Sequence, residues 1–232
     1  MLRALVWKDV RINRLPLLMA VVLMAAPYGV VAAAVMQMPL WQESTTASAW
    51  AVLLATGCYF SVMCSQASLA MLSGHLIAVE RADRSVEFIA YLPPSRFQLL
   101  LSKLFILAGA VAIVWGANLA LREFSGYLAG DARDPAHALV ADMASFWSLA
   151  AVGALAMSAG WCASCMLSGT GGPVAMAFFS PVILVGVLQS LGYASGWPDQ
   201  FSIGAVYRNA CWLLGAALFA VGTVHFLRRV EP

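Results

Sequence analysis

Charged side chains are scarce in this sequence of 232 residues. Only 10% of the residues are Asp, Glu, Lys or Arg, whereas 62% are hydrophobic and the mean hydropathy is +0.84. A soluble domain carries about 25% charged residues. We therefore expect an integral membrane protein. The net charge of +2, without a continuous basic patch, argues against a nucleic-acid partner.

Lysine is rarer still, since the chain has only Lys8 and Lys103. A phosphate-binding P-loop requires the motif G-x-x-x-x-G-K-[ST], and no such motif occurs. The glycine cluster SGTGGP at 168–173 has no lysine after it and predicts a tight turn between two spans. Any ATP-binding module must then be another polypeptide, and we expect no cofactor bound to this chain itself.

Cysteine and histidine are too few and too scattered to predict a metal or redox site. Five cysteines lie in apolar stretches, and Cys162 and Cys165 form a C-x-x-C without a second pair or a histidine cluster. We read them as small side chains that allow close helix packing, and we expect no metal site.

The same scarcity weighs against enzyme classes. An intramembrane protease could pair His225 with Ser158 or Ser164, but neither serine lies in a G-x-S-x-G motif and His225 is close to Arg228. His75 and His225 could be imagined as haem ligands, although a lone histidine at a helix end is more often solvated. We expect no catalytic site in this chain.

Long apolar runs are what the sequence has in abundance. A membrane-spanning helix needs about 20 mostly apolar residues. Six such runs predict an all-α polytopic membrane protein that forms a single domain over residues 1–232. The predicted spans cover residues 15–36, 49–79, 99–121, 144–167, 173–191 and 206–227.

The positions of lysine and arginine predict the orientation. With six spans both termini share one side, which holds ten of the 13 basic residues and is therefore expected to be cytoplasmic. The opposite side holds Arg122, Arg133 and Arg208. We expect an ordered external element in loop 122–142 and an interfacial turn in 189–207. The predicted location is a bacterial cytoplasmic (inner) membrane.

Residues 1–14 have the pattern of an amphipathic helix lying in the membrane interface, in contact with lipid headgroups. The alternative is a positively charged flank that only orients the first span. On a helical wheel the apolar side is Leu2, Leu5, Val6, Val10 and Ile12, and the basic side is Arg3, Lys8, Arg11 and Arg14.

Segment 80–96, ERADRSVEFIAYLPPSR, is the densest charged stretch. Its spacing predicts a short cytoplasmic helix that ends at Pro93 and Pro94, because a proline disfavours helical angles in the preceding residue. Ser95 and Gln98 fit a capping box at the start of the third span. An ordinary charged loop that only enforces topology is the alternative.

This segment resembles the cytoplasmic segment of ABC-2 type transporter permeases, in which a glutamate-rich stretch is followed by G-T-L-E, an apolar run, L-P-V-S-R and a lysine. Arg84, Ser85 and Pro94 stand where that pattern has glycine, threonine and valine. The matching residues are Glu80, Arg81, Glu87, Leu92, Pro93, Ser95, Arg96 and Lys103.

The resemblance implies a permease subunit that works with a separate ABC ATPase, which binds ATP and Mg. Two membrane chains, identical or homologous, and two ATPases would make one transporter, usually an exporter. The short helix between spans two and three would act as a coupling helix. Mapped onto this sequence, the ATPase-coupling residues are Glu80, Arg81, Arg84, Glu87, Phe88, Pro93 and Arg96.

The substrate path is less defined by the sequence. No charged residue lies near the middle of a predicted span, which argues against a proton- or ion-driven carrier. A weakly polar path would suit an amphipathic or lipid-like cargo. Close helix packing is the alternative explanation for the serines of span two, and a membrane anchor or regulatory subunit is the alternative function. The path candidates are Ser61, Ser65, Ser68, Ser180 and Gln189.

Overall fold

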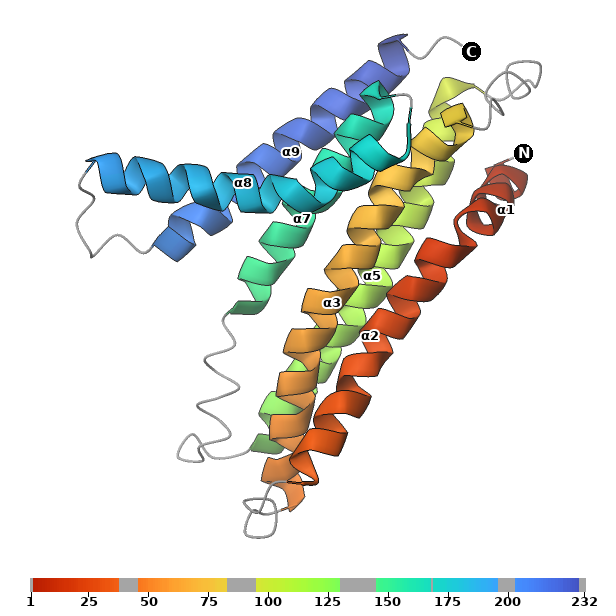
Figure 1. Cartoon of the computed structure of the whole chain (residues 1–232). Helices are drawn as coiled ribbons and strands as arrows, with labels where there is room; N and C mark the ends of the chain where they lie inside the picture. Colours follow the sequence, from red (N-terminus) through yellow and green to blue (C-terminus); the bar gives the residue numbers. More distant parts are fainter. Residues whose placement is uncertain are drawn as a thin grey trace.

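The computed structural model describes residues 2–37, 46–82, 95–129, 145–167, 169–195 and 203–229. The regular structure in these residues is entirely helical (Figure 1). Six of the helices, from α2 onward, are long and apolar enough to cross a membrane, so the predicted six-span fold is confirmed. The helices are α1 (Leu2–Ile12), α2 (Arg14–Val35), α3 (Thr46–Ala82), α5 (Arg96–Ala129), α7 (Ser145–Met166), α8 (Gly171–Ser195) and α9 (Ile203–Arg229).

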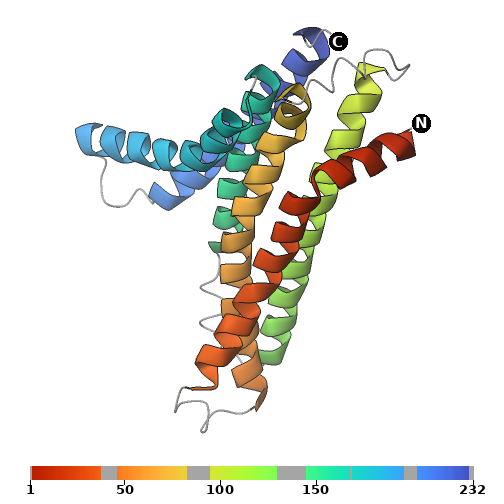
Figure 2. The ribbon, with the colours of Figure 1, turned by 45° about the vertical axis from the view of Figure 1, so that its right-hand side comes forward.

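Helix α3 is the element around which the others assemble. It contacts α2, α5, α7 and α8, and it runs beside α2 and α5 in both views (Figures 1 and 2). Its Leu69, Leu72 and Leu76 side chains are fully buried and belong to the same core cluster as Trp161 of α7. Because lipid is as apolar as leucine, close packing rather than removal from water stabilises this core.

Helix α7 connects this group to α9. The Trp161 ring stacks on Phe219 with the ring centroids 5.7 Å apart, and its indole N–H donates to the Thr223 hydroxyl at 3.2 Å. Gly222 brings the two helices close, since a Cβ there would lie 2.8 Å from the Cα of Cys162. Small residues therefore permit the backbone approach that membrane helices use for packing.

Helix α8 lies at a steep angle to α3 and leaves most of its surface uncovered (Figure 1). Val182 and Ile183 are 63% and 57% exposed. An apolar helix surface that is exposed over most of its length is stable only against lipid or another apolar helix. Pro181 deprives the Ala177 carbonyl of its usual N–H donor, and the Ser180 hydroxyl donates to that carbonyl at 3.4 Å.

Three expectations about the loops are corrected by the helix boundaries. Residues 122–129, which we placed in an external loop, continue α5 to Ala129. Gly126 is the only helix breaker in that stretch, and a single glycine is tolerated inside a helix. Helix α8 likewise takes the first part of 189–207, because it runs to Ser195. The connection between spans four and five is shorter than the predicted turn at 168–173, because α7 ends at Met166 and α8 begins at Gly171, so that residues 171–173 are helical.

The predicted start of the third span is confirmed. The Gln98 N–H donates to the Ser95 hydroxyl at 3.3 Å, and the Ser95 N–H donates to the Gln98 side-chain oxygen at 3.2 Å. This reciprocal pair is a capping box. Both views place α1 at the end of the bundle where α3 ends, α5 begins and α9 ends (Figures 1 and 2). We call this end the α1 end.

Candidate coupling site

Helix α1 turns an acidic residue towards the protein. Leu5, Asp9 and Asn13 follow one another at every fourth position and are all buried, with Asp9 2% and Asn13 1% exposed. The Asn13 side-chain amide donates to the Asp9 carbonyl at 2.9 Å where α1 gives way to α2. The buried face of α1 is therefore partly polar, whereas the sequence predicted a wholly apolar one.

Four charged side chains from three helices meet at the α1 end, and we call them the cation–carboxylate cluster: Lys8 and Asp9 of α1, Glu80 of α3 and Lys103 of α5. The Lys103 amine lies 2.7 Å from Glu80 Oε2 and 3.7 Å from Asp9 Oδ1. The Lys8 amine lies 2.5 Å from Glu80 Oε1 and 3.5 Å from Asp9 Oδ1. Two cations and two anions balance each other in a space where Lys103 is only 1% exposed.

Neutral groups complete the hydrogen bonding of the cluster. The Ser102 hydroxyl donates to Asp9 Oδ2 at 2.7 Å, and the Lys103 amine donates to the Leu76 carbonyl at 3.0 Å. A buried ion pair costs desolvation energy that only good geometry and further hydrogen bonds offset. Both conditions hold here. Losing one partner would leave an uncompensated charge and would be strongly destabilising.

The cluster connects the two helices on either side of the charged segment to α1. Glu80 lies near the end of α3 and Lys103 near the start of α5, and these two helices are joined by residues 83–95. Glu80 pairs with Lys8 of α1, Lys103 pairs with Asp9 of α1, and Glu80 and Lys103 pair with each other. A force applied to the joining segment would therefore be shared by α1, α3 and α5.

The structure buries one of the predicted coupling residues. We expected Glu80 to face a partner ATPase, but Glu80 is only 6% exposed, because Lys8 and Lys103 hold its carboxylate inside the chain. Arg96 begins α5 and donates to the Leu227 carbonyl near the end of α9 at 3.4 Å. A cation near the C-terminus of a helix is favourable. The remaining predicted coupling groups, the Arg81 side chain, Arg84, Glu87, Phe88 and Pro93, lie outside the described part of the structure.

The three serine candidates for a substrate path are buried in helix packing. Ser61 and Ser65 are 0% exposed and Ser68 is 1% exposed. The Ser61 hydroxyl donates to the Met24 carbonyl of α2 at 2.7 Å, one residue after the Leu23 carbonyl that Pro27 deprives of its N–H donor. The Ser65 and Ser68 hydroxyls donate to carbonyls three residues earlier in α3. These contacts favour the packing interpretation.

The two candidates on α8 are in different surroundings. Ser180 is partly exposed and bonds to the carbonyl that Pro181 leaves without an N–H donor. Gln189 is exposed. The hydrogen bonds of Ser61, Ser65, Ser68 and Ser180 each go to a different backbone carbonyl, and none of these bonds joins one candidate side chain to another. Their role in transport stays a prediction.

Sequence reasoning missed a polar contact between α2, α3 and α5. The Tyr28 hydroxyl donates to Asn118 Oδ1 at 2.7 Å, and the Cys58 thiol donates to the Asn118 carbonyl at 3.1 Å. Gly57 makes room for Tyr28, because a Cβ there would lie 2.5 Å from the Tyr28 ring. The available signal was Asn118, an isolated amide inside an apolar run. For the cluster the signal was Asp9, an acid on the otherwise apolar side of α1.

The structure gives no support to a metal site in the residues that it describes. No group of three or more His, Cys, Asp or Glu side chains is positioned there to hold a metal ion. Cys162 and Cys165 are both buried. Cys162 packs against Gly222 of α9, as the small-residue interpretation predicts.

Comparison with known families identifies the chain. The model of a family described as ABC-2 family transporter protein matches residues 7–183, which is more than half of the 232 residues. No curated protein and no solved structure matches the chain. The matched range includes most of α1, all of α3, α5 and α7, and the whole cation–carboxylate cluster. The chain therefore belongs to the ABC-2 family of transporter permeases, as the resemblance of segment 80–96 predicted.

Proposed function

We propose that this chain is the membrane subunit of an ABC exporter driven by a separate ATPase. Membership of the ABC-2 family supports the role of a permease, and the chain has no P-loop of its own. Two such chains, identical or homologous, would assemble with two ATPase subunits that bind ATP and Mg. The concentration of basic residues on the side of the termini supports a cytoplasmic position for the α1 end in a bacterial inner membrane.

The observation that carries the proposal is the cation–carboxylate cluster. A coupling element must transmit movement of the ATPase to several membrane helices at once. Glu80 and Lys103 stand on the two helices that flank segment 83–94, and each is ion-paired to α1. Since breaking a buried pair costs about 3–5 kcal/mol, the three helices would move together.

In this proposal the partner ATPase binds segment 83–94 rather than the cluster itself. Arg84, Glu87 and Phe88 would contact the ATPase, with Arg81 beside them and Pro93 shaping the turn. Glu80 and Arg96 would not contact the ATPase; they would be positioning residues that hold the two ends of this segment against α1 and α9. The cargo would be amphipathic or lipid-like, since no charged residue lies in the middle of any span.

Co-purification tests the proposal. The tagged chain is extracted in mild detergent, its partners are identified by mass spectrometry, and ATP hydrolysis is assayed on the same sample. We expect a stoichiometric partner with a P-loop. A single chain, confirmed by crosslinking in intact membranes, would contradict the exporter and favour the anchor or regulatory subunit.

Charge reversal on segment 83–94 tests the coupling role. Glu87→Lys or Arg84→Glu should detach the ATPase or uncouple its ATP hydrolysis while the chain still inserts into the membrane. Arg208→Glu is the matched control, because Arg208 lies near the start of α9, whereas it is the end of α9 that lies at the α1 end. Normal ATPase association and transport in both segment variants would refute the coupling assignment.

A further inference from the structure

The exposed face of α1 differs from the buried one. Arg3, Arg11 and Arg14 are all exposed, and none of them forms an ion pair with a described residue. The two lysines of this region are both paired inside the cation–carboxylate cluster. Carboxylates of the same chain therefore balance the two lysines, whereas the three arginines are accessible to an external anion.

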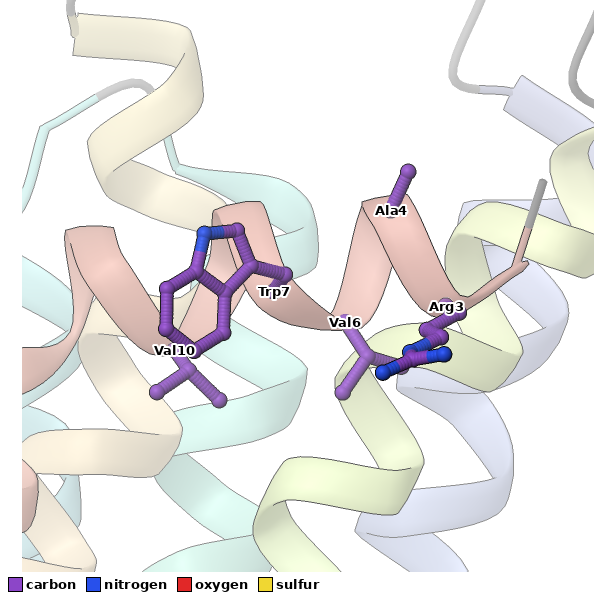
Figure 3. A pocket seen from close by; sticks show the side chains of 5 residues that line it. All are labelled: Arg3, Ala4, Val6, Trp7 and Val10. Carbon is purple, nitrogen blue, oxygen red and sulfur yellow. The ribbon is translucent and has the colours of Figure 1, made fainter.

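A hollow lies beside the first of these arginines. It has a volume of about 700 Å³ and is lined by Arg3, Ala4, Val6, Trp7 and Val10. Figure 3 shows the Arg3 and Val6 side chains reaching away from α1 on the same side, with the Trp7 ring near Val10. The hollow therefore combines an aliphatic wall, an indole and a guanidinium, which suits a ligand with both an apolar and an anionic part.

The exposed surface at the start of α2 is apolar. Leu15 and Leu18, in the first turns of α2, are 65% and 60% exposed, and the membrane-spanning part of α2 begins at Arg14. Arg14 is therefore expected at the depth of the lipid headgroups. Helix α1 bends away from the line of α2 and runs across the end of the bundle (Figure 2). Trp7, which is 71% exposed, is the residue type that concentrates at this depth.

We propose that α1 holds a binding site for an anionic phospholipid. Arg3, Arg11 and Arg14 bind the phosphate and other anionic groups of the headgroup, and the hollow beside Arg3 takes part of an acyl chain against Val6 and Trp7. The apolar surface at the start of α2 favours lipid over an acidic protein surface. Arg3, Trp7 and Arg11 are exposed whereas Asp9 is buried, so lipid bound to these three residues would lie on the outer side of α1 and hold it against the cluster. This proposal does not depend on the transport activity.

Lipid binding to the full chain tests the site. The purified chain in neutral detergent is titrated with phosphatidylglycerol or phosphatidylcholine, and bound lipid is measured by native mass spectrometry. We expect preferential binding of phosphatidylglycerol. The triple variant Arg3→Gln, Arg11→Gln, Arg14→Gln should weaken that binding by about fivefold for each arginine, or roughly a hundredfold in total.

Two matched variants make the result specific. Replacing the same three arginines with lysine keeps the charge and should retain most of the binding, whereas Arg208→Gln should leave it unchanged. If the triple glutamine variant fails to fold, which far-UV circular dichroism would show, the single variants Arg11→Gln and Trp7→Ala are used instead, each with a loss of at least threefold expected.

Three results would overturn the proposal. The first is equal binding of phosphatidylglycerol and phosphatidylcholine. The second is full displacement of the lipid by millimolar inorganic phosphate, which would indicate a site for free anions. The third is unchanged lipid binding in the triple glutamine variant together with loss of a co-purifying ATPase, which would assign the arginines to a protein partner.

Discussion

Replacement of Lys103 by methionine tests the central feature of this structure. The substitution keeps most of the volume of the side chain but removes an amine that lies 2.7 Å from Glu80 and 3.7 Å from Asp9. It also removes the donor to the Leu76 carbonyl. Because one partner of a buried ion pair is lost, we expect the free energy of unfolding to fall by about 3 kcal/mol or more.

A double substitution separates pairing from packing. Lys103→Met combined with Glu80→Gln removes one cation and one anion, so Lys8 and Asp9, 3.5 Å apart, remain as a neutral pair. We expect the double variant to be more stable than the sum of the two single effects predicts, by about 2 kcal/mol. Far-UV circular dichroism during unfolding by sodium dodecyl sulfate in mixed micelles measures each value.

Lys8→Met is the matched control for the Lys103 substitution. The Lys8 side chain is 33% exposed, so its amine gains less from pairing than a buried amine, and Glu80 keeps Lys103 at 2.7 Å after the substitution, so we expect a smaller cost of about 1 kcal/mol. The reasoning is refuted if Lys103→Met lies within 1 kcal/mol of the wild type. It is also refuted if the effects of Lys103→Met and Glu80→Gln simply add.

Three further predictions concern the packing of the spans. Gly222→Ala should destabilise the chain by about 1–3 kcal/mol, because the added Cβ would meet the backbone of α7. Gly116→Ala is the control and should be neutral or stabilising, since there is open space around Gly116. Equal unfolding midpoints for the two variants would contradict this prediction. Tyr28→Phe should cost about 1 kcal/mol in the same assay by removing the hydrogen bond to Asn118, and no change would show that the bond contributes nothing. Ser61→Ala should cost about 1 kcal/mol yet leave transport intact; a selective loss of transport would place Ser61 on the substrate path.

The helices were predictable because their causes are local. A run of about 20 apolar residues is enough to specify a membrane span, and six such runs were found as helices. The start of α5 depends on Ser95 and Gln98, which are three residues apart, so the sequence alone could predict their capping box. The predicted end of the same helix was wrong, because residues 122–129 are polar enough to suggest a loop but contain no strong helix breaker.

The site was predictable only in part. The resemblance of segment 80–96 predicted a coupling element, and the chain does belong to the ABC-2 family. It could not predict that Glu80 is buried. The helical wheel placed Lys8 with the outer basic residues, yet its long side chain reaches Glu80 on another helix. The wheel shows direction around one axis but not which neighbour lies within reach.

The sequence by itself determined that this protein has six helices long and apolar enough to span a membrane, and that its basic residues gather on the side that both termini share. Composition and local hydrogen bonding are sufficient for those conclusions. The tertiary structure decided which charges remain outside and which are paired within the chain. Asp9 and Lys103 are far apart in sequence and meet only because α1 packs against α5. A charge can be buried only where a partner of opposite sign is brought to it, and that depends on the packing of whole helices.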